Sequence, residues 1–225
     1  MVFAPPLYLS HIFWGLIITA IGVAIWKKNK DIEIDLFKDF SRFFLFWGLG
    51  FFIVFAILGI LGYILGNELL LTIGYPLPHF FGALAIGYLW KTTSRIYNPA
   101  LLKYFWIFVI YGFLIVGFGL YEMPEIVIEN SEVLLGPGSI TSIIIGAGFS
   151  GGLMIMGILN LIFGFSNTGE DRKKFLILGT GIVLMGLAGI LHNIGGSILT
   201  PLGEITNLTW IIIYVLSVFR YKVFE

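Results

Sequence analysis

The sequence Gly-Ile-Leu-His-Asn-Ile-Gly-Gly at residues 189–196 places an imidazole, His192, inside an apolar segment and close to the point where that segment ends. A similar sequence, Gly-Ile-Leu-Gly-Tyr-Ile-Leu-Gly, occupies residues 59–66 in the first half of the chain. The similarity predicts an internal repeat of apolar helices, and the imidazole marks a candidate site.

The composition of the chain is that of a membrane protein. Of its 225 residues, 58% are hydrophobic and 12% are charged, whereas a soluble domain carries about 25% charged residues. The net charge is zero, which gives no electrostatic support for nucleic-acid binding. Cysteine is absent, so disulfides and thiolate ligands are excluded. The expected partner is therefore the lipid bilayer.

Seven stretches are apolar enough to cross a bilayer, which takes roughly 20 residues of helix. They lie at residues 7–26, 43–65, 71–90, 104–121, 140–163, 175–194 and 208–219. The sequence Tyr-Pro-Leu-Pro at residues 75–78 interrupts the third stretch, so its helix is expected to begin at His79. These patterns predict an all-α integral membrane protein with a single domain over residues 1–225.

The basic residues alternate between the connections of these stretches. Every Lys and Arg follows the first, third, fifth or seventh stretch, and the connections at residues 66–78, 122–139 and 195–207 contain none. Because basic residues concentrate on the cytoplasmic side, we predict a multi-pass cell-membrane protein whose N-terminus is outside and whose C-terminus is cytoplasmic. Residues 1–6 contain no basic residue, so no cleaved signal peptide is expected.

Two connections have a composition of their own. Residues 31–42 mix aromatic and charged side chains, which predicts a short helix lying on the inner membrane surface. Residues 122–139 carry four glutamates and no basic residue, which is typical of a solvated cap.

Further matches extend the internal repeat. Residues 44–50 align with residues 175–181, and Gly15 aligns more loosely with Gly152. The predicted plan is 3+1+3: halves at residues 7–90 and 140–222 in the same orientation, and a linker helix at residues 104–121. Sugar exporters and microbial rhodopsins have a similar plan, but this is an analogy of fold that assigns no function. The seventh stretch lacks the lysine that a retinal protein needs.

No acidic or basic side chain falls within the core of the seven predicted stretches. Proton relays and ion pathways normally retain such residues. This pattern therefore argues against a proton-coupled pump and against a carrier of charged substrates.

The three histidines, His11, His79 and His192, each lie in or at the edge of a stretch. A rise of about 1.5 Å per helical residue puts all three at similar depths in the outer half of the bilayer. Two imidazoles on facing helices can be the axial ligands of a b-type haem. For this role His79 and His192 are the preferred pair, with His11 as a substitute.

Two alternatives to haem stay open for these histidines. Three converging imidazoles from His11, His79 and His192 would hold Cu or Zn. Without any cofactor, each ring would hydrogen-bond a neighbouring carbonyl or lie among the lipid headgroups.

Residues 146–151, Gly-Ala-Gly-Phe-Ser-Gly, look like the dinucleotide fingerprint of flavin enzymes. That fingerprint needs a strand before it and a helix after it in a βαβ unit. Here the run lies inside an apolar stretch, so its small residues are predicted to be helix-packing positions.

Three functions are consistent with these patterns. The first is a membrane b-haem protein for electron transfer, within a redox complex or alone. The second is a carrier or channel for a neutral or apolar small molecule. The third is a non-catalytic subunit of a membrane complex or homo-oligomer. No catalytic residue is predicted, and no pattern identifies an enzyme.

Overall fold

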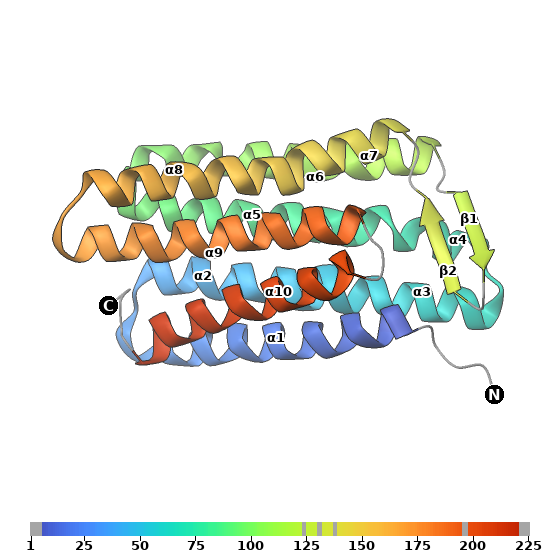
Figure 1. Ribbon diagram of the computed structural model, residues 1–225, viewed down its shortest axis with the longest axis horizontal. Helices are drawn as coiled ribbons and strands as arrows, with labels where there is room; N and C mark the ends of the chain where they lie inside the picture. Colours follow the sequence, from blue (N-terminus) through green and yellow to red (C-terminus); the bar gives the residue numbers. More distant parts are fainter. Residues whose placement is uncertain (1–5, 123–124, 130–131, 137–138, 195–197, 221–225) are drawn as a thin grey trace.

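The computed structural model describes residues 6–122, 125–129, 132–136, 139–194 and 198–220. The helices form an elongated bundle and run along its length (Figure 1). Within these described ranges, seven helical spans are long and apolar enough to cross a membrane: Tyr8–Lys30, Asp35–Leu65, Glu68–Tyr97, Pro99–Glu122, Ile143–Ser166, Gly169–Leu191 and Pro201–Phe219. The predicted helical architecture with seven candidate membrane spans is confirmed.

The first three spans, residues 6–97, form what we call the N-terminal unit. Its elements are α1 (Pro6–Ile32), α2 (Asp35–Leu45), the π-helical segment η1 (Phe46–Ile53), α3 (Val54–Leu65), α4 (Glu68–Gly74) and α5 (Pro76–Tyr97). The second span ends at Gly66, whose φ of +58° is the left-handed conformation that favours glycine. Asn67 then accepts a hydrogen bond from the Leu70 backbone N–H (3.0 Å) and begins α4.

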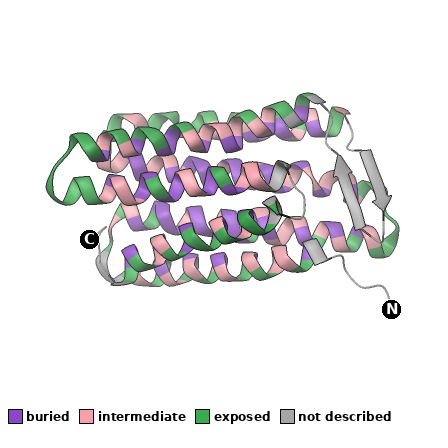
Figure 2. Ribbon diagram, in the orientation of Figure 1, coloured by how far each residue is buried: buried purple, intermediate pink, exposed green. Residues whose placement is uncertain are grey.

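The fourth span consists of a 3-10 segment, η2 (Pro99–Tyr104), followed by α6 (Phe105–Glu122). Its apolar side chains are largely exposed, including Trp106 and Phe113. Figure 2 shows that buried residues gather where other helices face one another. The exposed rings of α6 are therefore suited to contact with lipid.

Residues 125–136 contain an antiparallel hairpin of β1 (Glu125–Glu129) and β2 (Glu132–Gly136), with Ile128 opposite Val133. The sequence composition of this region predicted a solvated cap. The hairpin lies at the end of the bundle opposite the C-terminus (Figure 1).

The last three spans, within residues 139–220, form the C-terminal unit. Its elements are α7 (Ser139–Ile145), the π-helical segment η3 (Gly146–Gly151), α8 (Gly152–Ser166), α9 (Gly169–Ile194), α10 (Leu199–Val215) and the π-helical segment η4 (Leu216–Arg220). The Glu122 carboxylate accepts hydrogen bonds from the backbone N–H groups of Ile140 (3.0 Å) and Thr141 (2.7 Å). This side chain therefore satisfies donors in the first turn of α7.

The prediction of a surface helix at residues 31–42 is wrong. Most of this segment belongs to α2, which continues into the second span, and Phe37 and Phe40 are fully buried. The ring of Phe40 lies 5.2 Å from that of Tyr214 in α10, centroid to centroid. An amphipathic helix must bury its apolar face, and here α1, α5 and the rings of α10 provide the surface that a membrane was expected to provide.

The longer second span also brings charges into the bundle. The Asp39 carboxylate is 1% exposed and accepts a hydrogen bond from Arg95 Nε at 2.6 Å. Arg95 Nη1 lies 3.0 Å from the Asp35 carboxylate. This ion-pair cluster joins the start of the second span to the end of the third, outside the predicted cores that lack acidic and basic residues.

Two helices begin earlier than predicted, and a proline explains each difference. The third-span helix α5 begins at Pro76 rather than at His79, and α10 begins at Leu199 rather than at residue 208. Proline is tolerated in the first turn of a helix because the backbone N–H that it lacks would have no intrahelical partner there. Pro76 and Pro201 both occupy this place.

Close glycine contacts join the first two spans of each unit. A Cβ atom on Gly48 would lie 2.9 Å from the Gly15 carbonyl oxygen, and a Cβ atom on Gly179 would lie 2.9 Å from the Gly157 carbonyl oxygen. Both pairs bring two helix backbones together, as small residues do between membrane helices.

The glycine run at residues 146–151 also packs against a neighbouring helix. It forms η3 within the fifth span, after the helix α7 rather than after a strand. The Tyr111 ring of α6 occupies the space that a side chain at Gly148 would need, and the Tyr111 hydroxyl donates to the Ile144 carbonyl oxygen (2.8 Å). The helix-packing prediction is confirmed at Gly148.

Candidate binding cavity

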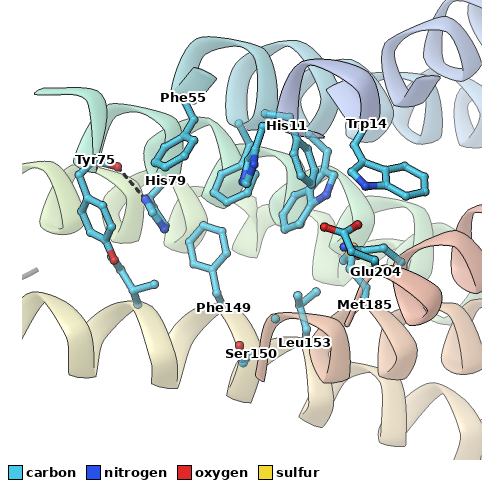
Figure 3. Close-up of a pocket in the computed structure, with 16 residues that line it drawn as sticks. His11, Trp14, Phe55, Tyr75, His79, Phe149, Ser150, Leu153, Met185 and Glu204 are labelled. Atoms are coloured by element: carbon cyan, nitrogen blue, oxygen red, sulfur yellow. Dashed lines mark hydrogen bonds between the residues drawn. The ribbon is translucent and has the colours of Figure 1, made fainter. Parts of the chain in front are cut away.

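A cavity of about 270 Å³ lies inside the bundle, between the N-terminal and C-terminal units (Figure 3). The N-terminal unit contributes His11, Trp14, Trp47, Phe51, Phe52, Phe55, Tyr75 and His79. The C-terminal unit contributes Ile145, Phe149, Ser150, Leu153, Met185, Gly189, Glu204 and Asn207. Of the described residues, none from the fourth span lines this cavity.

His79 lies in the first turn of α5 and is 8% exposed. Its Nδ1 atom lies 2.7 Å from the Tyr75 carbonyl oxygen (Figure 3). Because a carbonyl oxygen only accepts hydrogen bonds, this contact assigns the proton of a neutral ring to Nδ1 and leaves Nε2 as an acceptor. The rings of Tyr75 (4.7 Å) and Phe149 (5.4 Å) pack against the imidazole.

His11 comes from α1 and lines the same cavity. Its ring centroid lies 5.3 Å from that of Phe52, and the ring of Phe51 lies 5.2 Å from both Phe52 and His79. A continuous series of aromatic rings therefore connects the two imidazoles.

The backbone of His192 belongs to α9, but its side chain lies outside the described part of the structure. The pairing of His79 with His192 around a haem stays a prediction, as does a Cu or Zn site of His11, His79 and His192. Among the described residues, no group of three His, Cys, Asp or Glu side chains could hold a metal ion.

The volume of the cavity favours an occupant smaller than a porphyrin. Pockets for drug-sized ligands measure about 300–1,000 Å³, and this cavity is slightly smaller than that range. A haem is at least as large as such ligands, so it would require the two units to separate further.

Sequence reasoning missed Glu204 and Asn207 as site residues because it placed them in the connection at residues 195–207. Both lie in α10, three residues apart and therefore on one helix face. Figure 3 shows the Glu204 carboxyl group reaching from α10 toward the α1 side of the cavity. Asn207 is buried, and its Oδ1 accepts a hydrogen bond from Trp210 Nε1 (3.0 Å). Continuing the helical spacing backward from Trp210 was the signal that could have found them.

The aromatic lining was also not predicted. Aromatic residues make up 17% of the chain, so their presence in a span does not mark a site. Trp47 is nonetheless distinctive, because its indole N–H is buried and has no hydrogen-bond partner among the described residues. An unpaired buried donor is costly, and a bound molecule with an acceptor would satisfy it.

Helix irregularities border the cavity on three sides. The π-helical segment η1 carries Trp47 and Phe51, and η3 carries Phe149. The third span breaks at Tyr75, between α4 and α5. Such irregularities are frequent at functional sites, because they turn side chains or backbone groups away from the regular helical pattern.

The chain matches no family model, no curated protein and no solved structure.

Proposed function

We propose that this chain is a carrier for a small organic molecule in the cell membrane, built from two three-helix units that enclose the substrate. The observation that carries the proposal is the lining of the cavity, half of which comes from the N-terminal unit and half from the C-terminal unit. Carriers built from repeated halves bind their substrates at the interface between the halves. Movement of one unit against the other would open and close the cavity.

Equivalent contacts in the two units support a common design. A Cβ atom on Gly22 would lie 3.1 Å from the Leu45 backbone nitrogen, and one on Gly164 would lie 3.0 Å from the Leu176 backbone nitrogen. Leu45 and Leu176 occupy corresponding positions in the aligned segments 44–50 and 175–181. The contacts between the first two helices of each unit therefore recur at matching places.

The third helix of each unit shows the same correspondence. The Phe81 ring packs on Gly50 and the Tyr214 ring packs on Gly181, and these two glycines also correspond in the aligned segments. Together with the Gly15–Gly48 and Gly157–Gly179 pairs, these contacts favour a 3+1+3 repeat in which Gly15 corresponds to Gly157 instead of Gly152.

An aromatic cluster between the units closes one end of the proposed pathway. It consists of the fully buried rings of Phe40, Phe43, Phe44, Trp210 and Tyr214. Along the second span, this aromatic cluster precedes the cavity residue Trp47 and follows the ion pair at Asp39. In a carrier, the rings of this aromatic cluster would separate when the cavity opens toward the basic end of the bundle, where the connections carry Lys and Arg.

The proposed orientation places the N-terminus outside and the basic end in the cytoplasm. Because the chain has no cysteine, single cysteines can report it. In intact cells, a membrane-impermeant maleimide is expected to label Glu68→Cys but to label Lys173→Cys only after permeabilisation. Both residues are exposed, at opposite ends of the bundle. Labelling of Lys173→Cys in intact cells, with Glu68→Cys protected, would show that the protein has the opposite orientation.

Uptake into proteoliposomes tests the carrier. We expect saturable uptake of radiolabelled glucose, a neutral probe, or choline, a cationic probe, above that of protein-free liposomes. Ser150→Leu places a larger side chain in the cavity lining and should reduce uptake at least tenfold. Ser166→Leu, the same change at an exposed position at the end of α8, should not.

Two results would overturn the carrier proposal. One is uptake of neither probe above the protein-free background, and the other is equal uptake by the Ser150→Leu and Ser166→Leu proteins. A Soret absorbance band in the purified protein, lost in His79→Ala, would instead support the haem prediction.

A further inference from the structure

Among the described residues, the cavity lining contains one acidic side chain, that of Glu204, and no Lys or Arg. The remaining lining consists mostly of aromatic and aliphatic side chains, with aromatic rings supplied by both units.

Aromatic rings bind cations as well as apolar groups. The face of an indole, phenol or phenyl ring attracts an ammonium group, and cages of such rings recognise quaternary ammonium ligands. Here Trp14, Trp47, Phe51, Phe55 and Phe149 line the same cavity as Glu204, and Figure 3 shows Trp14, Phe55, Phe149 and the Glu204 carboxyl group facing this space. This combination of rings and one carboxylate is suited to an organic cation.

We propose that the substrate of this cavity is a small organic cation, an ammonium compound held by Glu204 and the aromatic lining. The proposal rests on the carrier function above and names its substrate class. It differs from the neutral or apolar substrate expected from the sequence, because Glu204 lies in a helix that lines the cavity and not in a connection.

The other titratable side chains that line the described part of the cavity are His11, His79 and Tyr75. The hydrogen bond from His79 Nδ1 to the Tyr75 carbonyl leaves Nε2 as an acceptor in the neutral ring. A neutral His79 therefore adds no positive charge to the cavity.

The size of the cavity and the indole of Trp47 further narrow the class of substrate that would fit. An apolar cavity of about 150 Å³ holds benzene, so about 270 Å³ is suited to an occupant of roughly ten non-hydrogen atoms. The buried indole N–H of Trp47, without a partner among the described side chains, would donate to a hydroxyl or ether oxygen on the occupant. The favoured occupant is therefore an ammonium compound that carries one such oxygen.

Equilibrium binding of radiolabelled choline to the purified full chain tests the substrate class. The uncharged isostere of choline, in which carbon replaces the quaternary nitrogen, serves as a competitor. We expect choline to bind at least tenfold more tightly than the isostere. Glu204→Gln should weaken choline binding about 10- to 100-fold, as expected for loss of a close contact between opposite charges, and leave isostere binding within about twofold. Glu68→Gln, at an exposed position outside the cavity, should change neither.

The outcomes separate the substrate class from the carrier function. Equal binding of choline and the isostere would overturn the proposal that the substrate is an organic cation. Choline binding that is the same in Glu204→Gln as in the unchanged protein would also overturn it. Uptake of glucose without binding of choline would overturn the cationic substrate but would support the carrier function. Choline binding that depends on Glu204, without uptake of either probe into liposomes, would overturn the carrier alone.

A purely structural role of Glu204 predicts a different set of results. His11 is the titratable side chain on the α1 side of the cavity, toward which Glu204 reaches. If Glu204 only stabilises this wall, Glu204→Gln and His11→Gln will lower the thermal stability of the protein equally. Neither variant will then change the ratio of choline to isostere affinity, and that result contradicts the proposal.

Discussion

Replacing Arg95 with leucine is expected to lower the free energy of unfolding by about 3–5 kcal/mol. The Asp39 carboxylate is 1% exposed, and Arg95 Nε at 2.6 Å is its short ion-pair contact. The second cation, Arg42 Nη1, lies 3.8 Å away on a side chain that is 41% exposed, so it compensates only weakly. Leucine at position 95 would leave a buried charge almost unpaired. Unfolding in mixed micelles of a mild detergent and SDS measures the loss.

Two controls identify the cause of this loss. In the double variant Arg95→Leu with Asp39→Leu, most of the stability should return, because apolar residues can replace a buried ion pair at little cost. Lys173→Gln breaks an exposed pair with Glu170, whose side chains are 62% and 67% exposed, and should cost less than about 1 kcal/mol. An Arg95→Leu protein as stable as Lys173→Gln would show that the buried pair does not hold α2 against α5.

Alanine at Gly48 or at Gly179 is expected to destabilise the bundle by about 1–3 kcal/mol for each substitution. A Cβ atom on Gly48 would lie 2.6 Å from the Thr19 backbone nitrogen, and one on Gly179 would lie 2.8 Å from the Leu161 backbone nitrogen. Backbone atoms cannot turn aside as a flexible side chain can, so the paired helices would have to separate. The same unfolding experiment in micelles measures each loss.

Gly117 in α6 provides the matched control for these two substitutions. A Cβ atom there would meet no atom within 4 Å. Gly117→Ala should therefore be neutral or stabilise the protein by up to about 1 kcal/mol, because alanine is the better helix former. If Gly48→Ala and Gly179→Ala behave like Gly117→Ala, the helices do not depend on close backbone contact. A loss at only one of them would show that the two units differ in packing.

The seven spans could be predicted because two independent patterns agree. Apolar stretches of sufficient length and the alternation of basic residues both require the same number of crossings. The ends of the spans were predicted less accurately, because Pro76 and Pro201 look like helix breaks in the sequence. In the structure each occupies a first turn, where proline is permitted.

The cavity could be predicted only in part. Glu204 was assigned to a connection because Gly195, Gly196 and Pro201 surround it with residues typical of loops. The aromatic face of α2 has the pattern of a membrane-surface helix, and only the position of α10 reveals that a protein partner covers it. Both errors concern contacts between distant parts of the chain, which a local pattern does not contain.

The π-helical segment η1 has a consequence for how the two units came to differ. From Phe44 to Gly59 the second span has one residue more than the sixth span has from Phe175 to Gly189, and a π-helical segment is the form in which a helix accommodates an inserted residue. One added amino acid rotates everything beyond it by about 100° around the helix axis. Phe51, Phe52 and Phe55, which lie within or just beyond η1, form one wall of the cavity. In the proposed repeat, a single inserted codon would thus be enough to aim a different set of side chains at the interior of one unit.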